Sequence, residues 1–144
     1  MKRILLLSIV CIAFFQLATA QGGAEITFLE ERFDFGSIEE GPKVSHEFTF
    51  KNTGTEPLVL SNVKASCGCT TPSWPKDPIL PGEQAAILVT YNTVKRIGAF
   101  NKSISISSNA KEATKIIYIN GTVVAAPDEE TMPIKQPLMI APSN

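Results

Sequence analysis

The chain has 144 residues, of which 44% are hydrophobic and 19% are charged, and its formal net charge is −1. This length suits a single domain, and the apolar fraction is high enough to exclude a wholly disordered chain. The near-even charge balance gives no reason to expect nucleic-acid binding, which needs clustered Lys and Arg. Three cysteines and a single histidine leave few residues for metal or nucleophile chemistry.

Residues 1–20 have the pattern of a secretory signal peptide. A basic Lys2-Arg3 precedes an apolar stretch at 4–15, and Ala18-Thr19-Ala20 supplies the small residues of a cleavage site. The apolar stretch is too short to cross a bilayer, so we expect no membrane span in the mature protein. Cleavage after Ala20 would remove Cys11. We expect an exported chain, located in the periplasm, at the cell surface or outside the cell.

Short strands are predicted in chain order along the mature protein. The clearest is 44–51, where Val44, His46, Phe48 and Phe50 alternate with polar residues. The expected strands cover residues 25–29, 33–38, 44–51, 58–63, 85–91, 100–107 and 114–122. No stretch of a dozen residues has a helical period. The fold class is therefore all-β, a single immunoglobulin-like β-sandwich of about seven antiparallel strands within residues 24–125.

The core of this sandwich is expected to come from the apolar positions of the predicted strands. These are Phe33, Phe35, Phe48, Phe50, Leu58, Leu60, Leu88, Ile104, Ile106, Ile117 and Ile119. Residues 126–144 differ, because they hold four prolines and the acidic run Asp128-Glu129-Glu130. Proline cannot donate to a sheet ladder, so this segment is predicted to be a flexible tail.

A connection of roughly 17 residues, 66–82, is the most unusual stretch and is long for a compact domain. It contains Cys67-Gly68-Cys69-Thr70, four prolines and the only tryptophan, Trp74. Long connections are often functional, and an aromatic residue on a stiff loop suits an interface. Cys67, Gly68, Cys69, Thr70 and Trp74 are therefore the predicted binding loop.

Four interpretations of Cys67 and Cys69 stay open. An oxidising compartment favours a local disulfide, with Gly68 allowing an unusual backbone, but two residues in extended conformation lie too far apart to bond. The pair could instead be shielded thiols, a thiolate site for Cu(I) or Zn, or a redox-active pair. A metal would need further ligands, for which the chain offers His46. The alternation at 44–50 favours His46 as a partly buried strand residue.

Four segments, in order, resemble one bacterial family. They are Phe33-Asp34-Phe35-Gly36 with Gly41; His46-x-Phe48-x-Phe50-x-Asn52-x-Gly54; Pro57-Leu58 leading to Ser66-Cys67-Gly68-Cys69-Thr70; and Pro81-Gly82 with Gly98-x-Phe100. Together they resemble the domain of unknown function 1573 family (DUF1573) of secreted bacterial proteins, over about residues 25 to 124. The first two segments are also similar, less specifically, to Hydin-type and major-sperm-protein-like domains. The resemblance implies an immunoglobulin-like sandwich and brings no established activity.

The sequence contains no recognisable catalytic set, so we expect a non-enzymatic module without a cofactor, which binds a protein or cell-envelope partner. The alternative hypotheses are a periplasmic protein that handles Cu or Zn, and a thiol-redox protein. Both would act through Cys67 and Cys69.

Overall fold

The computed structural model describes residues 22–126, all of them in strands and their connections. The predicted signal peptide and the predicted tail beyond residue 126 lie outside this part of the chain. Within residues 22–126 no helix is long and apolar enough to cross a membrane.

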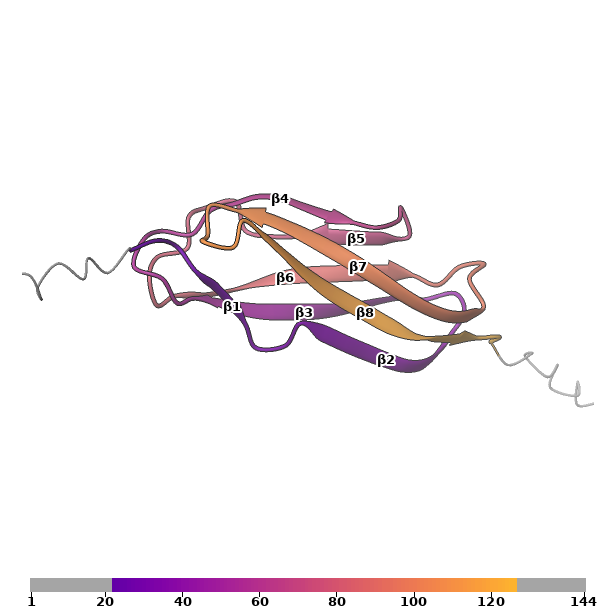
Figure 1. Cartoon of the computed structure of the whole chain (residues 1–144). Helices are drawn as coiled ribbons and strands as arrows, with labels where there is room; N and C mark the ends of the chain where they lie inside the picture. The colour runs from indigo at the N-terminus through magenta and orange to yellow at the C-terminus, as the bar shows by residue number, and fades with distance from the viewer. Residues whose placement is uncertain (1–21, 127–144) are drawn as a thin grey trace, which may run out of the picture.

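Eight strands form two packed sheets (Figure 1). In chain order they are β1 (Ile26–Phe28), β2 (Arg32–Glu39), β3 (Lys43–Asn52), β4 (Leu60–Ala65), β5 (Thr70–Ser73), β6 (Gln84–Asn92), β7 (Gly98–Ser108) and β8 (Thr114–Val124). The first sheet has the order β1-β3-β6-β5, and the second has the order β2-β8-β7-β4. The predicted all-β immunoglobulin-like sandwich is confirmed.

Two details differ from the predicted set of about seven antiparallel strands. β2 runs parallel to β8, although every other pair is antiparallel. β5 is an extra strand inside the segment that the sequence indicated as a loop, and it contains Pro72. A proline is tolerated there because β5 is an edge strand, bonded to β6 on one side only.

The core lies between the sheets and contains most of the predicted residues. Phe48, Phe50, Leu58, Leu60, Ile104, Ile106, Ile117 and Ile119 are buried, while Phe33 and Phe35 are half-buried against them. Leu88 was wrongly assigned to the core, because it is 37% exposed while Ile87 and Val89 are fully buried. Both faces of 85–91 are largely apolar, so alternation could not reveal which face points inward.

A buried asparagine joins three segments at one end of the first sheet. Asn52 is fully buried, and its Nδ2 donates to the carbonyl oxygens of Glu56 (2.8 Å) and Ile79 (2.9 Å). Its Oδ1 accepts from the backbone N–H groups of Gly54 (3.0 Å) and Glu25 (3.4 Å). A single side chain thus holds the start of the domain, the turn after β3 and the segment before β6.

Gly54 allows the chain to pass close to itself beside this asparagine. A Cβ at residue 54 would meet the carbonyl oxygen of Gly23 and lie 2.5 Å from the backbone nitrogen of Glu25. The backbone at 53–55 also donates to the carbonyls of Glu25 and Gly23. The Phe-x-Phe-x-Asn-x-Gly segment therefore has a structural role, since it places two core rings, a buried hydrogen-bonding amide and a close backbone crossing.

Candidate functional site

The Cys67-Gly68-Cys69 segment carries the chain from one sheet to the other. It leaves β4, the edge of the second sheet, and enters β5, the edge of the first sheet, by a tight turn. The Thr70 N–H donates to the Cys67 carbonyl oxygen across this turn, at 3.3 Å. The turn brings the two cysteine Cα atoms to 5.3 Å, inside the ordinary disulfide range, and the structure joins their sulfur atoms.

The sequence-based objection to this disulfide assumed an extended backbone, which the turn replaces. The role expected of Gly68 also differs from the structure. Gly68 does not lie in the left-handed region of φ, and a Cβ added there would meet nothing within 4 Å. Neither backbone conformation nor space therefore requires glycine at this position.

The disulfide turn closes the edge of the sandwich against the core. Cys69 is only 8% exposed, and half-buried Cys67 also packs on the core cluster. The buried Thr70 hydroxyl lies 3.6 Å and 3.8 Å from the sulfurs of Cys67 and Cys69. The Cys69 carbonyl oxygen accepts from the N–H of Asn92, which ties the turn to β6 at 2.9 Å.

Trp74 is placed differently from an exposed aromatic anchor. Its half-buried side chain packs against the core, and the Lys76 ammonium nitrogen lies 3.1 Å from the centroid of its ring. The indole Nε1 is buried and has no hydrogen-bond partner within residues 22–126. A partner would reach the Lys76 side of the ring only by displacing this cation.

His46 lies on β3, away from the cysteines. Its ring stacks on Phe33 at 3.5 Å, meets Phe48 edge-on at 4.8 Å, and its Nε2 donates to the Glu30 carboxylate at 2.7 Å. Cys67, Cys69 and His46 are thus not brought together. The described part of the chain holds no group of three His, Cys, Asp or Glu side chains arranged to bind a metal ion.

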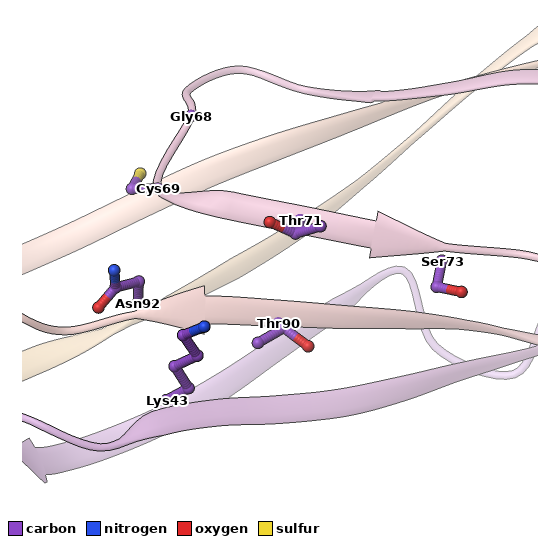
Figure 2. Close-up of a pocket in the computed structure, with 7 residues that line it drawn as sticks. All are labelled: Lys43, Gly68, Cys69, Thr71, Ser73, Thr90 and Asn92. Carbon is purple, nitrogen blue, oxygen red and sulfur yellow. The ribbon is translucent and has the colours of Figure 1, made fainter.

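Beside the disulfide turn, the outer face of the first sheet forms an open groove that the sequence did not indicate. Its volume is about 400 Å³. Figure 2 shows the groove running across β3, β6 and β5. It is lined by Lys43, Gly68, Cys69, Thr71, Ser73, Thr90 and Asn92.

Strand register explains how these residues meet. Thr90 of β6 pairs with Ser45 of β3 on one side and with Thr71 of β5 on the other, which sets three hydroxyl residues in a row. Ser45 and Thr90 share a hydrogen bond of 2.9 Å. Lys43 pairs with Asn92 in the next row, and Leu88 pairs with Ser73 on the far side. Alternation places all of these side chains on the solvent face.

The free edge of β5 offers a poor template for an added strand. In an antiparallel pair, every second residue directs its backbone N–H and C=O groups toward the partner strand. The hydrogen bond between Cys69 and Asn92 shows that Thr71 directs these groups toward β6, so those of Thr70 and Pro72 point to the free edge of the sheet. The Thr70 N–H already donates to Cys67, and Pro72 has no N–H. Ligand binding on this side is therefore expected in the groove rather than along the edge.

Solved structures of similar shape come from several kinds of protein. A protein of unknown function from Porphyromonas gingivalis W83 matches with a TM-score of 0.61 and 21% identity, over 76% of this chain and 50% of that one. The ASH/PapD-like domain 7 of human CEP192 matches with a TM-score of 0.61 and 10% identity, over 77% and 93%. The secreted serine protease VesC from Vibrio cholerae matches with a TM-score of 0.53 and 19% identity, over 82% and 27%.

At these identities the likeness shows the immunoglobulin-like fold alone. The chain spans half the length of the Porphyromonas gingivalis chain that it matches. No curated protein sequence matches. A family model described as "Protein of unknown function (DUF1573)" matches residues 26–123, which is most of the described domain and more than half of the whole chain. The chain therefore belongs to the DUF1573 family, as the Cys-Gly-Cys-Thr segment and the accompanying motifs indicated.

Proposed function

We propose that this chain is an exported, non-enzymatic binding module, and that the groove beside the disulfide turn is its binding surface. The observation that carries the proposal is the groove itself, an open polar depression on the solvent face of the first sheet. Its volume, about 400 Å³, falls in the range of small-ligand sites. The binding surface is thus shifted from the predicted loop around Trp74 to the strand faces that the loop adjoins.

The groove is built on rigid elements, which favours binding. The three strands that carry its lining are held by backbone hydrogen bonds, with β6 paired to β3 on one side and to β5 on the other. The disulfide fixes the turn that forms one rim of the groove. A surface that is already ordered loses little conformational entropy when a partner binds. Such preorganisation allows a small polar site to bind a partner specifically.

The chemistry of the lining residues supports binding rather than catalysis. The seven lining residues include three with hydroxyl groups but no histidine, aspartate or glutamate. The lining therefore lacks the imidazole or carboxylate that most often serves as the general base to activate a hydroxyl. Export is supported by the basic, apolar and small-residue pattern of residues 1–20 and by a cysteine pair suited to an oxidising compartment. Its structural neighbour VesC is itself a secreted protein.

Affinity capture from a bacterial envelope extract tests the proposal. Thr71→Glu places a negatively charged side chain in the groove, and Thr122→Glu makes the same change at an exposed strand position on the second sheet. We expect the wild-type domain and Thr122→Glu to retain the same envelope component, and Thr71→Glu to lose it. Equal retention by both variants would exclude the groove. Retention of nothing by the wild-type domain would contradict the binding function.

A further inference from the structure

The groove presents one ammonium group, one amide and three hydroxyl groups, and this limits what it can bind. The Oδ1 of Asn92 accepts from the backbone N–H of Val94 at 3.1 Å, and Figure 2 shows its NH₂ group on the Cys69 side. The hydroxyls of Thr71 and Ser73 make no hydrogen bond to any residue of 22–126 and are free for a ligand. Lys43 adds an ammonium group, which Figure 2 shows between Asn92 and Thr90.

Within residues 22–126 no ion pair neutralises the charge on Lys43. The three ion pairs within residues 22–126 join Glu30 to His46 and Lys115 to Glu31 and Glu112, and none includes Lys43. The groove lining contains no carboxylate. An ammonium group in a lining without carboxylates is suited to a carboxylate ligand, to which it can donate a charge-assisted hydrogen bond.

The sheet face just beyond the Ser73 end of the groove is different. Ser73 pairs with Leu88, whose side chain is 37% exposed on the same face. Leu88 lies four residues from Asn92 on β6, which is about 13 Å along a strand. Glu47 pairs with Leu88 from the other side and would repel a second carboxylate there. The outer face of the sheet therefore has a cation at one end of the groove and, beyond its Ser73 end, an exposed leucine, with hydroxyl groups between them.

We propose that the groove and the adjoining Leu88 bind an extended peptide segment with an acidic side chain at the Lys43 end and an apolar side chain four residues away. An extended peptide advances about 3.3 Å per residue, so this spacing matches the distance between Asn92 and Leu88. A peptide is favoured over an acidic sugar because no aromatic ring lines the groove to stack on a sugar face. This inference rests on the proposed binding function and specifies the ligand of the same site.

The test is an NMR titration of the ¹⁵N-labelled domain with the capped peptide Asp-Ser-Gly-Ser-Leu. We expect saturable shifts of the backbone amides of Thr71, Ser73, Thr90 and Asn92. Replacing the Asp of the peptide by Asn, or Lys43 by Gln, should each weaken binding about fivefold, as for an exposed ion pair worth ~1 kcal/mol. The control Lys64→Gln removes an exposed lysine from β4 on the second sheet and should leave the affinity unchanged.

Several results would overturn the inference. These are equal affinity for the Asp and Asn peptides, no effect of Lys43→Gln, or shifts confined to residues outside the groove. Tighter binding of tri-galacturonate than of the peptide would assign the site to an acidic glycan instead. If the peptide fails while Thr71→Glu still abolishes capture of an envelope component, only the ligand class is wrong. If both experiments fail, the proposed function fails too.

Discussion

Replacing Asn52 by alanine tests the structural role assigned to the Phe-x-Phe-x-Asn-x-Gly segment. The change removes four hydrogen bonds that link the start of the domain, the turn after β3 and the segment before β6. The buried bond to the carbonyl of Ile79 is worth about 0.5–1.5 kcal/mol, and that carbonyl keeps the N–H of Leu58 as a donor. The other three bonds are part-buried and are worth about 0.5–1.5 kcal/mol each.

These contributions share one side chain and do not simply add, so we expect the free energy of unfolding to fall by about 4 kcal/mol. Urea unfolding followed by tryptophan fluorescence measures this change, with Asn62→Ala as the matched control. Asn62 is an exposed asparagine on β4 whose side chain makes no hydrogen bond within residues 22–126, and its replacement should cost less than about 0.5 kcal/mol. Similar losses for the two variants would refute the role of Asn52 in joining the three segments.

Other variants test separate parts of the structure by the same unfolding measurement. Gly54→Ala should lower the free energy of unfolding by ~2 kcal/mol or more, because the added Cβ meets backbone atoms. Gly68→Ala should leave the free energy unchanged or raise it by up to about 1 kcal/mol, because the added Cβ meets nothing. The reverse order of the two effects would contradict the geometry of both glycines. Lys95 has a φ of 57°, and Lys95→Asn should raise the free energy by up to about 1 kcal/mol, since asparagine tolerates this conformation better; a clear loss of stability would count against the reasoning. Cys67→Ala/Cys69→Ala should cost about 1.5 kcal/mol, the value for so short a closed loop, with unfolding still cooperative; loss of cooperativity would show that the pair organises the whole core.

Much of the fold could be predicted because its strands carry clear local patterns. Phe48 and Phe50 alternate with polar residues, and both are buried as expected. Leu88 was misassigned because its strand is apolar on both faces, so burial there depends on the partner sheet rather than on periodicity. The parallel pairing of β2 with β8 could not be predicted, since alternation identifies a strand but not its neighbour.

The groove could not be predicted for a related reason. Lys43, Thr71 and Asn92 are distant in sequence, and none of them belongs to a motif with recognisable chemistry. Only the register of β3, β6 and β5 brings them together. The prolines of this segment, Pro72 among them, indicated a loop where the structure has the edge strand β5. Proline is compatible with this strand because its backbone nitrogen lies on the unpaired edge, where no hydrogen bond is needed. Cys67 and Cys69 marked the neighbourhood of the site but not the surface.

Site-specific photo-crosslinking tests most directly whether the groove is the binding surface. A photoreactive amino acid in place of Ser73 would project from β5 into the groove. The same photoreactive amino acid in place of Thr122 would project from the second sheet. After irradiation in an envelope extract, we expect the residue 73 variant to form a defined covalent adduct, whose yield falls when Lys43 is changed to Gln. We expect no adduct from the residue 122 variant. Adducts of equal yield at both positions, or at residue 122 alone, would contradict the assignment of the groove.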